Sequence, residues 1–541
     1  MITTIYTKVL NSKWLVVAII LLGVILRFVG IWWNLPKIYH PDETALISGG
    51  LGLRIVSNLK HFDWPHMQMY ISLFTVSIWA KITDIYFNFT GISGANSGSI
   101  LLERPASFYL VVRFVSFLMA SASLVIFYKG VKEFLGRNTA LISLLFFVLS
   151  LQNIEDAHYA TLESALTFWV VLVFFFSQRI IKSDKVINYI LAGLFAGFAT
   201  STKYNGALVV LLIFSAHVLN VVKSKKSSWQ IIFSKQLFIA AIVAVAGFFI
   251  GTPYALLDFK TFIRSDSPAG AFWQFKRQKT PIGESLLNFN LGETRYKTSV
   301  GTSFGVVGAI LTIIGVFLFF RSFGNISFFL LFFPALYFWY IGTLKLFYPH
   351  YLNPIYPFFA ILASLSFIQV AKYLFCKFKK PILKKLIISL FFLVTFGGLF
   401  YRAIIMDFVF ATGDTRRQAE NWIVQNVIPG SVVGVGGAYS VNLDDFINGT
   451  GYNATKINEV FRSMDTEIGH TAQIAYFKSK GINLIVTGDY GLDSRLKTSF
   501  PTSCRYPSGD AWAIDTMKVI KLFPSRSPVE PTVAVLGFDN K

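Results

Sequence analysis

The sequence has few cysteines and few charged residues for its length. Only two of its 541 residues are cysteine, Cys376 and Cys504, and 14% are charged, whereas 54% are hydrophobic. Two cysteines exclude a disulfide framework and a thiolate metal site of the usual size. The low charge, together with 56 phenylalanines, excludes an ordinary soluble globular chain and indicates a polytopic α-helical membrane protein.

Several short motifs are also missing. No HxxxH or CxxC spacing marks a metal site. The absence of a fixed-period repeat argues mildly against a transporter built from inverted repeats. No small-residue cleavage site follows the first apolar run, so we expect that run to stay in the protein as a membrane anchor.

Long apolar segments recur along the chain. A helix of about 20 apolar residues crosses the roughly 30 Å hydrocarbon core of a bilayer. We predict about eleven crossings, at residues 14–33, 108–128, 139–151, 164–178, 189–200, 206–221, 236–256, 301–320, 326–343, 351–373 and 386–402. The fifth and sixth depend on a break at Lys203-Tyr204-Asn205-Gly206; the alternative is one long tilted helix.

The distribution of basic residues predicts the topology. The net charge of +21 resembles a nucleic-acid signal, but lysines and arginines gather in short segments between apolar runs, where they set orientation. We therefore expect no nucleic-acid partner and a multi-pass protein of the cytoplasmic (inner) membrane. Residues 1–404 form its membrane domain, with outer loops at 34–107 and 257–300.

Hydropathy falls after Tyr401, which predicts a small extracytoplasmic α/β domain over residues 405–541. An amphipathic helix follows Asp414, which caps its N-terminus. Residues 431–435 and 483–487 read as strands, and 474–480 as a helix.

Two carboxylates, Asp42 and Glu43, follow closely on the first apolar run. Pro41 precedes them, so the pair can open a short helix along the membrane interface. Helix capping in solvent is the alternative. Arg27 lies within the last turns of the first crossing, where a cation is costly unless it reaches the interface or finds an anion. We expect it to meet Asp42, Glu43 or a lipid phosphate.

A second polar segment runs from Glu155 to Glu163 between two crossings. On a continuous helix Asp156, Tyr159 and Glu163 share one side, while His158 lies on another. One helix therefore cannot direct all of these groups at a single metal ion. Glu163 begins an apolar run, where an ionisable group is by default a candidate site residue; interfacial solvation is the alternative.

Basic and aromatic residues are also predicted on the outer face of the membrane. Arg113 starts the second crossing, Lys203 interrupts the fifth and sixth, and His350-Tyr351 opens the tenth. Cations at the bilayer boundary can neutralise a lipid-linked phosphate without leaving the membrane. The alternative for each of these residues is a position at the membrane interface with no ligand bound.

The order of these motifs resembles the C-type glycosyltransferases, and more narrowly the protein O-mannosyltransferase and lipid A aminoarabinose transferase group. The resemblance covers residues 14–402. Its motifs are Asp42-Glu43, Trp64 to Tyr70, Arg113 to Ser116, Asp156 to Tyr159 with Glu163, Thr202-Lys203-Tyr204, Thr252 to Asp258, and His350-Tyr351 with Pro354 and Pro357. Two positions depart from the family pattern: Glu163 replaces the usual Asp, and His350 stands where many members have Arg.

The resemblance implies an enzyme that moves a sugar from a polyprenyl-phosphate donor to a glycan, lipid or protein acceptor on the outer face, with inversion. Asp42 is then the general base, and Glu43 orients the acceptor or holds a cation. The implied phosphate-binding residues are Arg27, Arg113, Lys203, His350 and Tyr351, and the sugar or acceptor pocket comprises Asp156, His158, Tyr159, Glu163, His66 and Tyr70. No cofactor is assigned with certainty, and Asp42, Glu43 and His158 leave a divalent metal ion open.

Two other functions stay open at the level of sequence. A carrier or flippase for lipid-linked saccharides would also be polytopic, basic and aromatic, but it needs ionisable residues near the midplane and access from both faces. A non-catalytic assembly protein built on the C-terminal domain would not depend on Asp42. Because polar residues gather on one predicted face, we favour the enzyme.

Overall fold

The computed structural model describes residues 12–91, 96–98, 106–225, 227–278, 282–324, 326–342, 344, 348–428, 431–436, 441, 453–456, 474–489, 518–526 and 530–537. Cys504 lies outside these residues, and Cys376 is a free, exposed cysteine. The chain divides into two compact units. One comprises Met1–Ile31 and Asp42–Ala403, and the other comprises Trp32–Pro41 and Ile404–Lys541.

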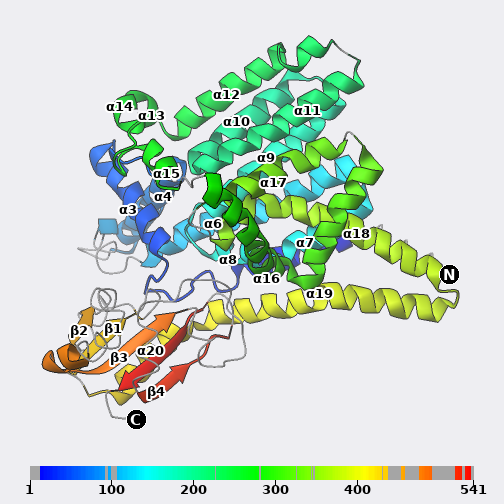
Figure 1. Cartoon of the computed structure of the whole chain (residues 1–541). Coiled ribbons are helices and arrows are strands. Elements are labelled where there is room, and N and C mark those ends of the chain that lie inside the picture. Colours follow the sequence, from blue (N-terminus) through cyan, green and yellow to red (C-terminus); the bar gives the residue numbers. More distant parts are fainter. Residues whose placement is uncertain are drawn as a thin grey trace. The chain divides into compact units, whose positions relative to one another are not determined.

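The first unit is a bundle of helices (Figure 1). It begins with α2 (Lys13–Phe28), α3 (Pro41–Val56), α4 (Met67–Thr90), α6 (Ala106–Leu135), α7 (Arg137–Val148), α8 (Leu151–Glu155) and the 3-10 helix η1 (Asp156–His158). It continues with α9 (Glu163–Lys182), α10 (Val186–Thr202), η2 (Tyr204–Val209), α11 (Val210–Lys223), η3 (Ser228–Ile231) and α12 (Lys235–Gly251). The remaining elements are α13 (Tyr254–Leu257), α14 (Phe259–Phe262), α15 (Ala271–Gln278), α16 (Ile282–Phe323), α17 (Ile326–Gly342), η4 (Pro349–Ile355), α18 (Tyr356–Lys377) and the start of α19 (Pro381–Thr412).

The prediction of a polytopic α-helical membrane protein is confirmed. Every predicted apolar segment overlaps a helix. In the described part of the chain, seven helices are long and apolar enough to cross a membrane, or eight if α7 and the α8–η1 pair, bent by 62°, form one crossing. Helices α10 and α17 are apolar but shorter. The number eleven therefore stays a prediction.

The predicted break between the fifth and sixth apolar segments is confirmed. Helix α10 ends at Thr202 and η2 begins at Tyr204, while Lys203 between them has an extended backbone with φ −154°. One long helix through this stretch, the alternative left by the sequence, is excluded.

Two stretches differ from their predicted structure. The segment 155–163 is not a continuous helix, because α8 ends at Glu155, η1 follows, and α9 begins only at Glu163. The predicted loop 257–300 contains α14, α15 and the start of α16. Aromatic residues recur at helical spacing in α15, which favours a short amphipathic helix there. The side chains of Arg277 and Lys279 lie outside the described residues.

The backbones of helices α10 and α12 lie in direct contact with each other. A Cβ atom added at Gly193 would lie 2.4 Å from the carbonyl oxygen of Ala240, and one added at Gly197 would lie 2.3 Å from that of Ala244. Real Cβ atoms do not approach so closely, so glycine at these positions permits the contact. The two glycines lie four residues apart and share one face of α10.

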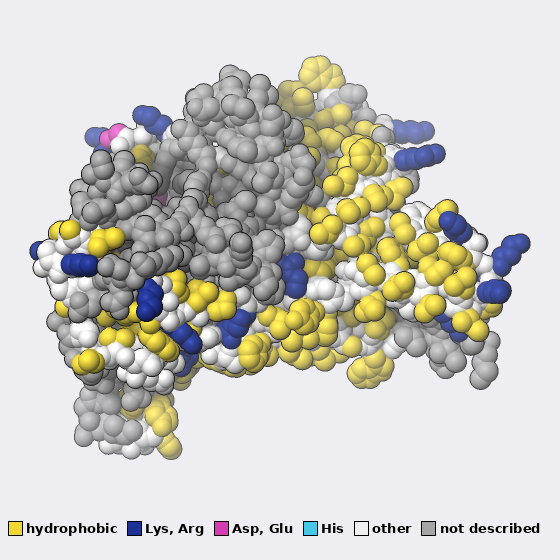
Figure 2. Space-filling model, turned by 60° about the horizontal axis from the view of Figure 1, so that its bottom comes forward, with side chains coloured by type: hydrophobic (Ala, Val, Ile, Leu, Met, Phe, Trp, Pro, Cys, Tyr) yellow, Lys and Arg dark blue, Asp and Glu magenta, His cyan; other side chains and the backbone are white. Residues whose placement is uncertain are grey.

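The surface of the protein carries many exposed hydrophobic side chains. Figure 2 shows many of them on the right-hand half of one face, while lysines and arginines occur at its right-hand end and also across its left half. On α16 and α19 the exposed residues include Val306, Ile310, Phe317, Phe320, Leu386, Leu390 and Leu393. Such an extent of exposed apolar surface is expected of helices that face lipid rather than water.

The second unit contains a small sheet with a helix, which confirms the predicted α/β fold of the C-terminal region, while its extracytoplasmic side stays a prediction. Five strands form one sheet in the order β2-β1-β3-β5-β4. They are β1 (Val432–Gly436), β2 (Asn453–Lys456), β3 (Ile482–Asp489), β4 (Lys518–Phe523) and β5 (Thr532–Gly537), and α20 (Thr415–Asn426) accompanies them. Strand β1 is parallel to β2 and β3, whereas β5 is antiparallel to β3 and β4. Ala419 and Ile423 of α20 join Val433 and Val535 in the core.

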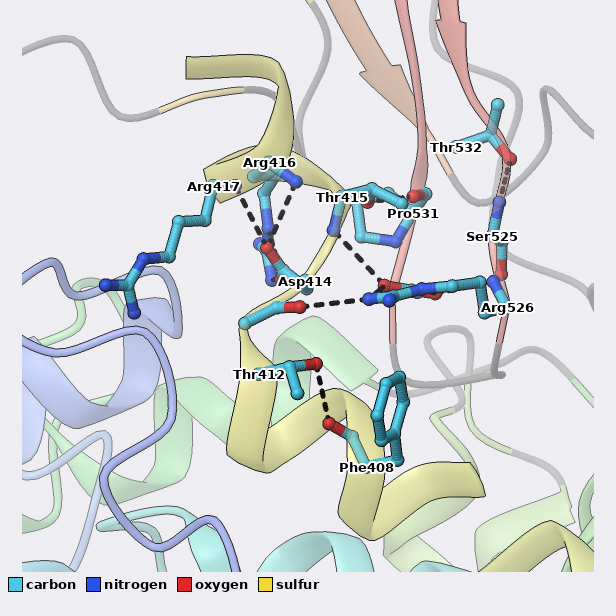
Figure 3. Close-up of polar contacts among 12 residues, drawn as sticks. Phe408, Thr412, Asp414, Thr415, Arg416, Arg417, Ser525, Arg526, Pro531 and Thr532 are labelled. Carbon is cyan, nitrogen blue, oxygen red and sulfur yellow. Dashed lines mark hydrogen bonds and ion pairs between the residues drawn. The ribbon is translucent and has the colours of Figure 1, made fainter. Parts of the chain in front are cut away.

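The turn from α19 to α20 is held by side chains of the same unit. Gly413 has a positive φ of 87°, and Asp414 caps α20 by accepting hydrogen bonds from the amides of Arg416 and Arg417. Figure 3 shows Arg526 reaching this turn, where it donates to the carbonyl oxygen of Gly413 at 2.9 Å. The predicted cap at Asp414 is therefore confirmed.

We expect Gly197→Val to destabilise the helical unit by roughly 1–3 kcal/mol, because α10 and α12 must separate to admit the side chain. Thermal unfolding in detergent measures this as a lower midpoint. Gly398→Val is the matched control, since Gly398 is exposed on α19 with no heavy atom within 4 Å of its added Cβ. Equal midpoints for the two variants would contradict the close approach.

Candidate functional site

Glu43 and Arg113 form a buried ion pair. Arg113 donates from Nε to Oε1 of Glu43 at 2.7 Å and from Nη2 to Oε2 at 2.8 Å. Both side chains are 0% exposed. The backbone amide of Ala160 donates to Glu43 Oε1 at 2.8 Å, and Arg113 Nη1 donates to the carbonyl oxygen of Ile31 at 3.1 Å. Glu43 thus holds a cation in place, one of the two roles predicted for it.

Arg27 is buried among backbone carbonyl oxygens. It is 1% exposed, and it donates to the carbonyl oxygens of Gly23, Phe147 and Val148 at 3.1 to 3.2 Å. The expected contact with Asp42, Glu43 or a lipid phosphate stays a prediction beside these backbone contacts. A guanidinium has five N–H groups, so carbonyl oxygens at the end of α7 can satisfy it inside the protein.

A second group of polar residues surrounds Glu163, the first residue of α9. Lys203 donates from Nζ to Glu163 Oε1 at 2.9 Å, and Nε2 of His350 lies 3.7 Å from the same oxygen. The side chain of Glu163 is 6% exposed, whereas those of Lys203 and His350 are 21% and 19% exposed. The extended residue between α10 and η2, the start of α9 and helix η4 therefore bring three predicted site residues together.

Aromatic rings border this group. The ammonium of Lys203 lies 4.3 Å from the ring centroid of Tyr351, and the imidazole of His350 stacks on Tyr348 with centroids 5.5 Å apart. Asp42, in the first turn of α3, is half-buried and close enough for its charge to act on Lys203 and Tyr351. We call Asp42, Glu163, Lys203, His350 and Tyr351 the charged cluster.

Asp156 lies on the neighbouring 3-10 helix η1 and is 4% exposed. Its Oδ2 accepts hydrogen bonds from Gln152, at 3.2 Å, and from Asn353. Asn353 is not among the site residues predicted from the sequence, although it stands three residues after His350. The sequence signal that could have identified this residue is its position, because it is a polar residue within the motif that begins at His350.

The remaining predicted pocket residues are buried against protein groups. The ring nitrogens of His158 each lie 2.8 Å from a carbonyl oxygen, one of Ile154 and the other of Val29. Tyr159, directly after η1, is 3% exposed. The structure therefore places His158 and Tyr159 within the core that supports the site.

His66 and Tyr70 form a separate pair at the start of α4. Their rings meet edge to face with centroids 6.4 Å apart, and Nε2 of His66 contacts the carbonyl oxygen of His61 at 2.8 Å. Burial lowers the pKa of His66 below its ordinary value. The amide of His66 donates to Thr252, the residue after α12.

The metal site left open by the sequence does not form in the described part of the chain. There, no three His, Cys, Asp or Glu side chains gather as ligands. Glu43 accepts hydrogen bonds from Arg113 and Ala160, and both nitrogens of His158 contact carbonyl oxygens. Asp42, Glu43 and His158 therefore do not present a common set of free lone pairs to an ion.

Residues 95–262 match the family model described as dolichyl-phosphate-mannose-protein mannosyltransferase. The predicted resemblance is confirmed. The matched stretch contains Arg113, the segment from Asp156 to Glu163, and Lys203. With it, the prediction of a membrane glycosyltransferase is confirmed as well. Among curated proteins, none matches the sequence.

Several solved structures are similar to the chain at low sequence identity. ArnT from Cupriavidus metallidurans, bound to undecaprenyl phosphate, is 14% identical with a TM-score of 0.47, covering 97% of this chain and 98% of that one. The Archaeoglobus fulgidus oligosaccharyltransferase, tethered with an acceptor peptide, is 12% identical with a TM-score of 0.45, covering 89% and 70%. The arabinosyltransferase EmbB from Mycobacterium smegmatis is 10% identical with a TM-score of 0.40, covering 68% and 32%.

We expect Glu43→Ala to destabilise the protein by about 3–5 kcal/mol, because it leaves the guanidinium of Arg113 buried without its carboxylate. The double variant Glu43→Leu/Arg113→Met removes both charges and should recover most of that loss. Unfolding midpoints of the two variants and of the wild type measure the effect. A wild-type midpoint for Glu43→Ala alone would mean that the buried pair does not form.

Proposed function

We propose that the protein transfers a sugar from a polyprenyl-phosphate donor to an acceptor hydroxyl on the outer face of the cytoplasmic membrane, with inversion at the anomeric carbon. One observation carries this proposal: the half-buried carboxylate of Asp42 lies in one charged cluster with two partly exposed basic side chains, Lys203 and His350. A base beside cations is what attack on a sugar phosphate needs.

Each step of the reaction has a candidate group. The acceptor hydroxyl gives its proton to the carboxylate of Asp42 while its oxygen forms the new bond to the anomeric carbon. The bond between that carbon and the phosphate oxygen breaks, and its electron pair stays on the phosphate. Because the leaving group is already an anion, no carboxylic acid is needed to protonate it, in contrast to a glycosidase.

The four basic side chains predicted to bind the phosphate differ in how much of each is exposed. Arg27 and Arg113 are 1% and 0% exposed, and they donate to backbone carbonyl oxygens and to Glu43. Lys203 and His350 are about one-fifth exposed. Lys203 has three N–H groups and gives one to Glu163, so others can reach a phosphate oxygen. We therefore assign the phosphate contact to Lys203 and His350, with Tyr351 beside them.

The other pocket residues have supporting roles in this proposal. Glu163 fixes the position of Lys203, and its charge limits the cost of burying the ammonium. Asp156, bonded to Asn353 of η4, connects η1 to the helix that carries His350. His66 and Tyr70 form an aromatic and polar pair that can contact an acceptor or a sugar ring.

We expect Asp42→Asn to reduce sugar transfer by at least 100-fold, because the amide cannot accept the hydroxyl proton. The assay measures free polyprenyl phosphate released from a panel of labelled polyprenyl-phosphate sugars, at equal concentration of folded protein. Asp63→Asn, on a loop before α4, is the matched control. Equal release by Asp42→Asn and wild type would remove Asp42 from the mechanism, and lipid translocation in vesicles without release would favour the carrier.

We expect Lys203→Met to weaken binding of the sugar donor by about 10- to 100-fold, the usual value of a hydrogen bond to a charged group. The variant keeps the length of the side chain but removes its charge and its hydrogen bonds. The measurement is the KM for the donor, supported by direct binding of polyprenyl phosphate. Lys260→Met, at an exposed position on α14, is the control; equal effects of both changes would point to general surface charge instead.

A further inference from the structure

Gln68, in the first turn of α4, is buried with an amide that has no hydrogen-bond partner within the described residues. It is 0% exposed, and neither Nε2 nor Oε1 is paired there. Among the buried side chains in the described part of the chain, it is the one amide side chain that leaves both of its polar atoms unpaired. Because the nitrogen donates and the oxygen accepts, a partner for Gln68 must both accept and donate hydrogen bonds.

Ser72 stands one turn later on the same face of α4. It is 1% exposed, and its hydroxyl also has no partner in the part of the helical unit that the structure describes. A hydroxyl within a helix commonly donates to the carbonyl oxygen four residues earlier. Thr75, Thr83 and Thr90 of α4 do this at 2.8 to 2.9 Å. Ser72 does not, so its hydroxyl is available to another group.

The burial of these polar atoms has no benefit for the stability of the protein alone. A buried polar atom without a partner lowers stability, whereas an apolar side chain of the same shape does not. Buried polar groups in proteins are therefore almost always hydrogen-bonded. The unpaired amide of Gln68 and the unpaired hydroxyl of Ser72 thus indicate a partner from outside the chain.

Hydrogen bonds on both sides of Lys203 connect it to the residues before α4. The hydroxyl of Tyr204 donates to the carbonyl oxygen of Phe62 at 2.7 Å. The hydroxyl of Thr252 pairs with that of Ser201 at 2.6 Å and accepts a hydrogen bond from the amide of the residue that precedes α4. The start of α4 is thereby fixed close to the lysine that we assign to the phosphate contact.

The segments that carry the two carboxylates of the charged cluster also contact α4. Met69 packs against α3, the helix that carries Asp42, since a Cβ atom added at Gly49 would lie 2.8 Å from its sulfur. Met69 also shares an apolar core with Leu162, the residue before Glu163. The start of α4 and the residues before it therefore lie among the segments that carry the charged cluster.

Flexible side chains flank Gln68 along the chain. Met67 packs against the end of α12, where a Cβ atom added at Gly251 would lie 2.8 Å from its sulfur, and Met69 packs against Gly49. Methionine is unbranched, has three rotatable bonds and repacks readily. Because Gln68 is 0% exposed, a ligand must displace a neighbouring side chain to reach it, and these methionines can move without a shift of a helix.

The hydrogen bonds that Gln68 and Ser72 can make select the kind of ligand. A phosphodiester accepts hydrogen bonds but donates none, so it would leave Oε1 of Gln68 unpaired, and a polyprenyl chain can do neither. A sugar hydroxyl both donates and accepts, and neighbouring hydroxyls of one ring can meet both atoms of an amide. The sugar of the donor and the sugar of a glycan acceptor share this chemistry.

We propose that Gln68 and Ser72 form a subsite that binds the hydroxyl groups of a sugar beside the charged cluster. This inference deepens the proposed function and rests on it for the kind of substrate. Its amide and hydroxyl are paired only when the sugar is bound, so the subsite recognises the sugar at a cost to the stability of the unbound protein.

Unfolding midpoints in detergent without ligand provide the first test. Gln68→Met keeps the length of the side chain and removes both unpaired atoms, so we expect its midpoint to equal or exceed that of the wild type. Gln178→Met is the matched control. Gln178 is also 0% exposed, but its Nε2 donates to Glu133 at 2.9 Å, so its loss should lower the midpoint. An equal decrease in both variants would overturn the proposal, because Gln68 would then have a partner within the protein.

A binding measurement isolates the contribution of the donor sugar. It compares a panel of polyprenyl-phosphate hexoses and pentoses with polyprenyl phosphate alone, in the full-length protein. We expect the preferred sugar to tighten binding, and Gln68→Met to lose about tenfold of that preference while the affinity for polyprenyl phosphate changes less than twofold. Ser72→Ala should lose a smaller part of the preference, and Gln178→Met should keep all of it.

A second binding measurement distinguishes the two sources of the sugar. Methyl glycosides of the same sugars are added to protein saturated with the donor, so that they report on the acceptor side. Weaker binding of a glycoside to Gln68→Met, with the donor preference unchanged, would assign the subsite to the acceptor. If Gln68→Met changes neither measurement, the proposal is overturned.

The same experiments separate this inference from the proposed function. A wild type that releases polyprenyl phosphate, with sugar binding that does not depend on Gln68, would refute the subsite and leave sugar transfer standing. A wild type whose sugar binding depends on Gln68 but which releases no polyprenyl phosphate would support the subsite and refute transfer.

Discussion

The buried pair of Glu43 and Arg113 determines the arrangement of the candidate site. It joins α3 to α6 and also binds the backbone at Ile31 and Ala160. Two buried charges cost less when every hydrogen-bonding group is used, which is the case for the carboxylate here. Adjacent residues of a helix point about 100° apart, so fixing Glu43 inward turns Asp42 toward the half-buried edge of α3. The structural role of one carboxylate thus sets the direction of its neighbour.

The charged cluster follows a second constraint, which concerns lysine rather than arginine. An arginine can donate inside the protein to several carbonyl oxygens or to both oxygens of one carboxylate, as Arg27 and Arg113 do. A lysine has a compact, strongly hydrated charge, and Lys203 stays partly exposed although Glu163 binds it. The two buried arginines therefore support the fold, whereas Lys203 stays partly exposed, which is why the phosphate contact is proposed there.

Local features were predictable from the sequence where the cause is local. Apolar runs of membrane length predicted the helices, the Lys203-Tyr204-Asn205-Gly206 stretch predicted the break between α10 and η2, and Asp414 predicted the start of α20. Features that depend on a partner far along the chain were not predictable from the sequence. Arg113 stands 70 residues from Glu43, and the break at η1 is accompanied by a bond from Asn353 to Asp156, 197 residues away. Periodicity carries no information on such partners.

The assignment of Trp32–Pro41 to the second unit has the same origin. By sequence this segment is the beginning of an outer loop, and only its contacts with residues near 414–420 reveal that it belongs with α20. Long-range polar contacts therefore decide to which unit this segment belongs, and the local sequence pattern does not show them.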